Sequence, residues 1–203
     1  MEINKKSLTD QIYSIIKEKI LNREIELGEQ INTREIAEEY DISQMPVRDA
    51  LRKLTNEDLV ENKPRVGFFV KNFSEEEIND ILEVRKMHEL YCLEYHFDNI
   101  DRIEVAKLRD KFENGDHEYF GSYDIHLHKL IVFASDNNYL IERYLKLINH
   151  YTMLFSYLNY KRSETSREEH VNLINSILDE DQKKACEILQ DHLDRVDIKD
   201  SDL

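Results

Sequence analysis

The stretch Ile42-Ser43-Gln44-Met45-Pro46-Val47-Arg48-Asp49-Ala50-Leu51-Arg52 decides how the N-terminal part of this chain folds. Ser43 can cap a helix that starts there, and Pro46 is tolerated in the first turn because its amide position has no helical partner. The apolar residues that follow recur at helical spacing and define a core face, namely Val47, Ala50, Leu51 and Leu54. The stretch therefore predicts a helix, with Arg48 and Arg52 one turn apart along it.

Two helices are predicted before this stretch. Ser7 and Asp10 have the spacing of a capping box, and apolar residues follow them at helical spacing: Leu8, Ile12, Ile15, Ile16 and Ile20. A short second helix is predicted after Asn32, which can cap it, and Ile36, Ala37 and Tyr40 continue it.

A hairpin is predicted after the third helix, because the apolar period changes there. The runs Leu59–Glu61 and Phe68–Lys71 are short and extended, and the turn between them carries two cations, Lys63 and Arg65. Three helices followed by a basic-tipped hairpin form the order of a winged helix-turn-helix.

The second half of the chain is predicted to contain only helices. They are expected at residues 75–97, 101–114, 117–134, 138–160, 166–179 and 182–196. The whole chain has only 4 Gly and 2 Pro, which suits long helices. Asn72-Phe73-Ser74 marks the junction, so we predict two domains, residues 1–72 and 73–203.

Charge also divides the chain. Of the net charge of −15, residues 1–72 contribute −2 and the remainder −13, and all eight histidines lie in the second half. A nearly neutral first domain can still present a local basic face, and the asymmetry suggests that the two domains have different partners. No apolar run approaches a membrane span, the N-terminus is polar, and Cys92 and Cys186 have no metal spacing. These features predict a cytoplasmic protein with free thiols and no membrane partner.

The first domain resembles the GntR family of bacterial transcription regulators. The resemblance rests on the stretch from Ile42 to Arg52, on the segments Leu27–Ile31 and Arg34–Ala37, and on the wing residues Arg65-Val66-Gly67 with Val70. Two positions depart from the family pattern, since Gln44 stands where Arg is usual and Asp58 where Gly is common. The first departure predicts an altered operator sequence, and the second adds an acid near the DNA side.

The second domain resembles the FCD effector domain of that family, which implies an antiparallel all-helical bundle. The motifs are Arg85–Glu89, Asp124–His128, Glu169-His170 and His192-Leu193. The expected fold class is therefore mainly α, with an N-terminal winged helix-turn-helix, a small β-wing and a C-terminal helical bundle.

The third helix is expected to enter the major groove, with its N-terminal residues near the bases. Arg pairs with guanine and Gln with adenine, so Arg48 is the favoured base contact and Gln44 the site of altered specificity. The full set of candidate DNA-binding residues is Arg34, Ser43, Gln44, Met45, Arg48, Arg52, Lys53, Lys63, Arg65 and Gly67. The alternatives are that the cations are ordinary solvated charges and that Gly67 serves only a tight turn.

Four residues are candidate metal ligands. Asp124 and His128 lie four apart and project from one helix face, and His170 and His192 lie on two later helices. Their agreement with the FCD pattern implies a site of three imidazoles and one carboxylate, suited to Zn, Ni, Fe, Mn or Co. The alternative is that each is an ordinary surface or structural residue; we assign that reading to the other histidines, His88, His96, His117, His126 and His150.

Arg85 is the candidate effector-binding residue, because a guanidinium can bind a carboxylate with two hydrogen bonds. A salt bridge with Glu89, four residues on, explains it equally well. The predicted function is a homodimeric repressor that binds a pseudo-palindromic operator and is controlled by a small carboxylic acid at the metal. The alternatives are a regulator that senses the metal alone and a metal-dependent hydrolase.

Overall fold

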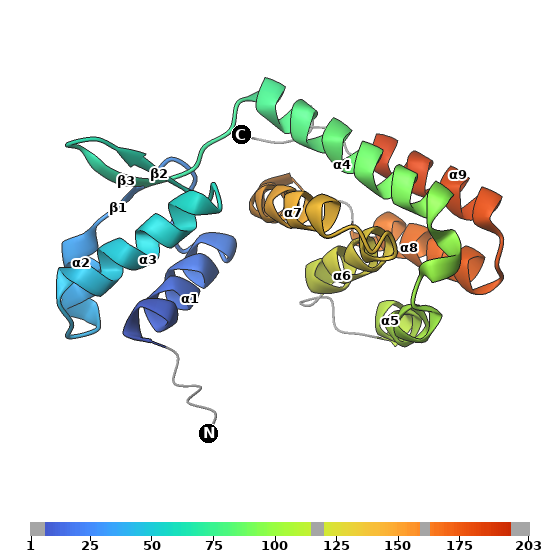
Figure 1. The fold of residues 1–203 in the computed structure, drawn as a ribbon, viewed down its shortest axis with the longest axis horizontal. Coiled ribbons are helices and arrows are strands. Elements are labelled where there is room, and N and C mark those ends of the chain that lie inside the picture. Colours follow the sequence, from blue (N-terminus) through green and yellow to red (C-terminus); the bar gives the residue numbers. More distant parts are fainter. Residues whose placement is uncertain (1–6, 115–119, 159–162, 196–203) are drawn as a thin grey trace. The chain divides into compact units, whose positions relative to one another are not determined.

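A computed structural model describes residues 7–114, 120–158 and 163–195. The chain divides into two compact units between Ser74 and Glu75 (Figure 1). Within the described ranges, no helix is long and apolar enough to cross a membrane.

From residue 7 onward, the N-terminal unit contains three helices and a three-stranded antiparallel sheet in the order β1-β3-β2 (Figure 1). Its elements are α1 (Leu8–Leu21), β1 (Gln30–Ile31), α2 (Thr33–Glu39), α3 (Gln44–Asn56), β2 (Val60–Lys63) and β3 (Gly67–Val70). The core forms where the apolar faces of α1 and α3 meet, through Ile12, Ile16 and Ile20 on one helix and Val47, Ala50, Leu51 and Leu54 on the other. This arrangement is the predicted winged helix-turn-helix.

Local side-chain chemistry sets two of the three helix starts. Ser7 and Asp10 form the predicted capping box at α1, and the Asn32 side chain accepts hydrogen bonds from two amides at the start of α2. Ser43 occupies the N-cap position of α3, but its side chain makes no capping hydrogen bond. The hydroxyl therefore does not contribute the cap that the sequence suggested.

Positive backbone angles shape the wing. Arg65 has φ 64° and Gly67 has φ 141°, an angle that side chains rarely adopt. A Cβ on Gly67 would also lie 3.0 Å from the Gln30 side-chain nitrogen, which donates to the Val66 carbonyl. Asp58 has φ 58°, which explains physically why a glycine suits that position.

The C-terminal unit is a helical bundle, so the predicted fold class is confirmed. Its elements are α4 (Glu75–Tyr95), the 3-10 turn η1 (Phe97–Asn99), α5 (Arg102–Asn114), α6 (Phe120–Phe133), α7 (Asn138–Leu158), α8 (Ser163–Leu178) and α9 (Gln182–Asp194). Helix α4 packs against α6, α7 and α9, and α8 packs against α5 and α9. The predicted helix over 75–97 ends at Tyr95, and the predicted helix over 166–179 begins earlier, at Ser163. The predicted helices over 117–134, 138–160 and 182–196 each include residues outside the described ranges.

Candidate DNA-binding surface and metal centre

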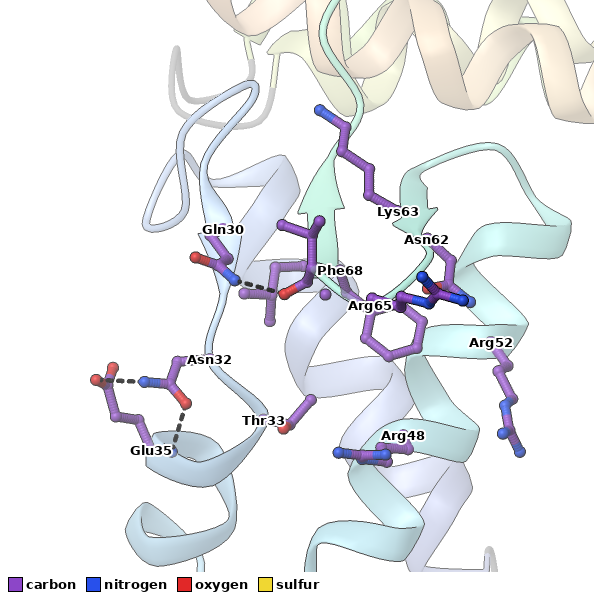
Figure 2. A pocket seen from close by; sticks show the side chains of 13 residues that line it. Gln30, Asn32, Thr33, Glu35, Arg48, Arg52, Asn62, Lys63, Arg65 and Phe68 are labelled. Carbon is purple, nitrogen blue, oxygen red and sulfur yellow. Dashed lines mark hydrogen bonds between the residues drawn. The ribbon is translucent and has the colours of Figure 1, made fainter.

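A groove of about 630 Å³ lies between α3, the start of α2 and the wing (Figure 2). Arg48 and Arg52 line it from α3, and Lys63, Arg65 and Gly67 line it from the hairpin. The groove thus brings together half of the ten candidate DNA-binding residues on one face. The other five are Arg34, Ser43, Gln44, Met45 and Lys53; all are exposed, but none lines the groove.

Ion pairing separates these cations into two groups. Four have an acidic partner: Arg34 with Glu38 at 2.8 Å, Arg52 with Asp49 at 3.1 Å, Lys53 with Asp10 at 2.5 Å, and Lys63 with Glu61 at 3.8 Å. No acidic partner is found for Arg48 or Arg65 within the described residues, and both are exposed. An anion in the groove would meet these two guanidinium groups without displacing a carboxylate.

The second cluster lies inside the helical bundle. Asp124 and His128 come from α6, His170 from α8 and His192 from α9, and one ligand atom from each lies within 4.8 Å of the other three. All four side chains are buried in the core of the bundle. The structure therefore brings together the four residues that the sequence picked out, and His126, on the same helix as Asp124, is exposed outside this cluster.

Each histidine of the cluster is held through its Nδ1 atom. His128 Nδ1 lies 2.6 Å from Glu89 Oε2, and His192 Nδ1 lies 2.7 Å from Glu169 Oε2. His170 Nδ1 lies 2.5 Å from the carbonyl oxygen of Ser166. A neutral ring that donates through Nδ1 carries its lone pair on Nε2, the atom with which it would bind a metal ion. This is the arrangement by which proteins orient metal-binding imidazoles.

Burial and neighbouring charge set the protonation of these groups. Burial lowers the pKa of His192 to about 4, in spite of its hydrogen bond to Glu169, so the ring is neutral near pH 7. Burial opposes ionisation of Asp124, but His128 and His170 hold the pKa of that carboxyl well below its usual range. Burial opposes protonation of His128, but Glu89 and Asp124 raise its pKa above the usual value. The neutral His192 ring and the ionised Asp124 carboxylate are the forms that a metal ion needs, and a metal ion would have to displace the proton from His128.

Arg85 on α4 is fully buried beside this cluster. Its Nε atom donates to Glu89 Oε1 at 2.7 Å, and its guanidinium carbon lies 3.7 Å from the centre of the Tyr151 ring. Glu89 Oε1 also accepts a hydrogen bond from the Tyr144 hydroxyl at 2.6 Å. Burial would raise the pKa of Glu89, but Arg85 and His128 lower it to about 2. Glu89 thus links Arg85 directly to His128.

Several buried polar atoms have no hydrogen-bond partner among the described residues. They include Nη1 and Nη2 of Arg85, Oδ2 of Asp124 and Nε2 of His192. Buried polar groups are almost always paired, because an unpaired one costs roughly 1–3 kcal/mol. The donor set, with its unpartnered Asp124 Oδ2 and His192 Nε2 atoms, fits a divalent transition-metal ion held by Asp124, His128, His170 and His192.

The sequence did not predict the roles of three residues in this centre, Glu89, Glu169 and Tyr144. The i, i+4 spacing of Arg85 and Glu89 did signal their salt bridge. No sequence signal connects Glu89 with His128, or Glu169 with His192, because these pairs join residues 39 and 23 positions apart.

Comparison with known proteins identifies the family. Residues 8–70 match the model of the bacterial regulatory proteins of the gntR family, and residues 80–195 match that of the FCD domain. The chain belongs to this family, whose members are transcriptional regulators that bind operator DNA, and not enzymes.

Relatives of this chain include regulators and a metal-binding domain. It is 28% identical to the gluconate operon transcriptional repressor of Bacillus subtilis, over 93% of this chain and 83% of that protein. A GntR regulator from Rhodococcus sp. RHA1 has the same fold, with a TM-score of 0.81, 19% identity and coverage of 93% and 95%. The Zn²⁺-bound FCD domain of TM0439 is 31% identical, with a TM-score of 0.55 over 62% of this chain and 91% of that domain.

Proposed function

We propose that this protein is a repressor whose affinity for its operator is controlled by a small carboxylic acid bound beside a divalent metal ion. The observation that carries the proposal is the set of unpartnered buried atoms on Arg85, Asp124 and His192. A buried guanidinium whose two terminal nitrogens have no partner among the described residues, beside a metal-type cluster, suits an anionic ligand that binds the guanidinium and the metal together.

Each residue has a defined part in holding such a ligand. The two terminal nitrogens of Arg85 donate to one carboxylate, while the Tyr151 ring and Glu89 fix the guanidinium plane. A metal ion on the four ligands would supply positive charge and coordination positions for a ligand oxygen; Zn, Ni, Fe, Mn and Co all suit the donor set. Arg85 and Glu89 lie on α4, the helix that begins directly after the domain junction, so a ligand-induced change there acts on the helix to which the DNA-binding unit is joined.

The DNA-binding unit reads the operator through α3 in this proposal. Arg48 contacts a guanine, and Gln44 and Met45 face neighbouring bases, with Ser43 at the helix start. The phosphate contacts come from Arg34, Arg52, Lys53, Lys63 and Arg65, and Gly67 lets the wing backbone approach the DNA. A homodimer would place two such units on the half-sites of a pseudo-palindrome. The relative from Bacillus subtilis named as a repressor supports repression over activation.

The second candidate is a regulator that responds to the metal alone. It is favoured by the Arg85–Glu89 salt bridge, which occupies Arg85 Nε and gives the arginine a structural role. In that case no organic acid should be required for release of the operator.

Thermal shift measurements with metal-loaded and chelator-stripped protein test the proposal. A panel of di- and hydroxycarboxylates should include members that stabilise the loaded protein and not the stripped one, and the same acids should release operator DNA selected from a random library. Arg85→Lys keeps the charge but removes the two-pronged donor, so it should abolish the acid-dependent shift. Arg143→Lys, an exposed position on α7, is the matched control. Stabilisation by uncharged compounds, independent of metal, would exclude this pocket chemistry; release by metal alone would favour the second candidate.

A further inference from the structure

The metal centre lies inside the helical bundle, so an ion needs a route by which to reach it. Three of the four candidate ligands, Asp124, His128 and His170, are 1% exposed or less, whereas His192 is 7% exposed. A functional metal site needs an entry path as well as suitable ligands. Since His192 is the most exposed of the four, the shortest path from the surface to the centre passes beside it.

A hollow of about 240 Å³ lies between α8 and α9 and is lined by His192. Other residues that line it are Glu168 and Glu169 from α8, Ile188 and Asp191 from α9, and Arg195, which follows α9 directly. A divalent ion with six waters needs about 180 Å³, at about 30 Å³ per water. The hollow therefore has room for a hydrated ion. We call it the α8–α9 hollow.

Glu169 connects the mouth of the α8–α9 hollow with the metal centre. Its Oε1 atom accepts a hydrogen bond from Nη1 of Arg195, and its Oε2 atom lies 2.7 Å from Nδ1 of His192. The Arg195 side chain is 56% exposed and that of Glu169 is 17% exposed, so these contacts lead from solvent to a buried metal ligand. On the inner side, Nε2 of His192 is buried and has no hydrogen-bond partner among the described residues.

The charge of the α8–α9 hollow favours a cation. Glu168, Glu169 and Asp191 contribute three carboxylates, and Arg195 contributes one guanidinium, which leaves a net charge of −2. A recess lined by one sign of charge raises the local concentration of the opposite ion and speeds its association. Carboxylate oxygens also replace water readily around divalent cations.

A second hollow, between α5 and α8, offers no comparable path. It is lined by Phe112, whose ring is fully buried and stacks on the ring of His170 with centres 4.9 Å apart. The aromatic ring therefore separates this hollow from the nearest ligand. The α8–α9 hollow has a ligand of the centre in its own wall.

We propose that the α8–α9 hollow is the entrance of the metal centre, where a hydrated divalent cation docks on carboxylates before it passes to His192. This inference rests on the metal centre of the proposed function and adds the route by which that centre is loaded. An entrance lowers the barrier to passage in both directions. It therefore sets the rates of metal uptake and loss and leaves the equilibrium affinity unchanged.

Exchange kinetics of Zn²⁺ on the full chain test the entrance with a bulky side chain. A chromophoric chelator follows uptake by stripped protein and loss from loaded protein, and an equilibrium titration gives the dissociation constant separately. Asp191→Trp places an indole over Ile188, because a helical side chain leans toward the residue three positions earlier. Compared with Asp191→Asn, which removes the same charge, it should slow uptake and loss alike by roughly 10-fold, since the ion enters only when the ring moves aside.

The matched control for the bulky side chain is Glu187→Trp. Glu187 is exposed on α9, one turn before Asp191, and does not line the α8–α9 hollow. This variant should exchange Zn²⁺ at the wild-type rates. Circular dichroism and the dissociation constant show that each variant is folded and keeps its metal centre.

Charge variants test the same entrance without added bulk. Glu168→Gln combined with Asp191→Asn should slow Zn²⁺ uptake by roughly 10-fold at low ionic strength. The difference from wild type should disappear near 1 M salt, where the screening length is about 3 Å. Glu187→Gln, which removes an acid of the same helix outside the hollow, should take up Zn²⁺ at nearly the wild-type rate.

Three results would overturn the entrance. The first is that Asp191→Trp exchanges Zn²⁺ as fast as Asp191→Asn; the second is that Asp191→Trp weakens affinity through faster loss alone. The third is that the double charge variant takes up Zn²⁺ at the wild-type rate at low salt. A wild-type chain that binds no Zn²⁺ in the equilibrium titration would refute the metal centre as well, whereas tight binding with unaltered rates in the variants would refute only the entrance.

Discussion

Removing one histidine of the metal centre should abolish most of the stabilisation that bound metal gives to the fold. In wild type, metal at 100 times its dissociation constant stabilises the fold by about 2.7 kcal/mol. Four-ligand sites bind zinc with about 10–16 kcal/mol, or about 3 kcal/mol per ligand, so loss of one ligand weakens binding about 100-fold or more. At the same metal concentration, His170→Ala then retains about 0.4 kcal/mol of stabilisation or less. Chelation should therefore lower the melting temperature of wild type by about 10 °C and that of the variant by about 1–2 °C.

The comparison of each protein with and without chelator isolates the contribution of the metal to stability. His170 also stacks on Phe112, with ring centres 4.9 Å apart, so the substitution lowers stability through lost packing as well. That loss is present with and without chelator, and it cancels from the difference. The control is His126→Ala, which changes an exposed histidine on α6 and should behave as wild type. Equal shifts on chelation for wild type and His170→Ala, or no shift for wild type, would refute the assignment of His170 as a ligand.

Three further predictions concern the DNA-binding surface and the support of the metal centre. Arg48→Ala should weaken binding to the operator by about 1–3 kcal/mol and relax the choice of one base pair per half-site. Arg65→Ala should weaken binding to operator and to scrambled DNA alike, and reduce the slope of affinity against salt by about one. Anisotropy titrations at several salt concentrations measure both effects, and an unchanged operator affinity of Arg48→Ala would contradict the reading of the major groove by α3. Glu169→Gln should lower metal affinity about 10–100-fold, because the hydrogen bond that orients His192 through Nδ1 becomes weaker. Isothermal titration with Zn²⁺ measures this affinity, and an unchanged value would show that Glu169 does not support the metal centre. Gly67→Ala should lower the melting temperature of the N-terminal unit through strain at φ 141° and crowding of Gln30, and a variant as stable as wild type would show that the wing adapts.

Elements set by local chemistry were predictable from the sequence. The apolar period located α1 and α3, and the caps at Ser7 and Asn32 located two helix starts, because these signals act within a few residues. The strand β1 was missed, since Gln30 and Ile31 have no pattern of their own and become a strand only by pairing with Phe69 and Phe68 of β3.

The metal centre, too, was predictable from the sequence only in part. The spacing of Asp124 and His128, and the family likeness of His170 and His192, were sufficient to name four candidates. Whether their ligand atoms meet depends on how α6, α8 and α9 pack, and only the tertiary structure shows that they lie within 4.8 Å of one another.

Arg85 shows most clearly what the sequence alone could not decide. From the sequence, a salt bridge with Glu89 and a free carboxylate-binding guanidinium were equal alternatives, because i, i+4 spacing permits a contact and says nothing of burial. The structure shows the bridge through Nε and, in addition, leaves Nη1 and Nη2 buried without a partner among the described residues. Burial, and the packing of one helix against another, arise from contacts between distant parts of the chain, so they could be decided only in three dimensions.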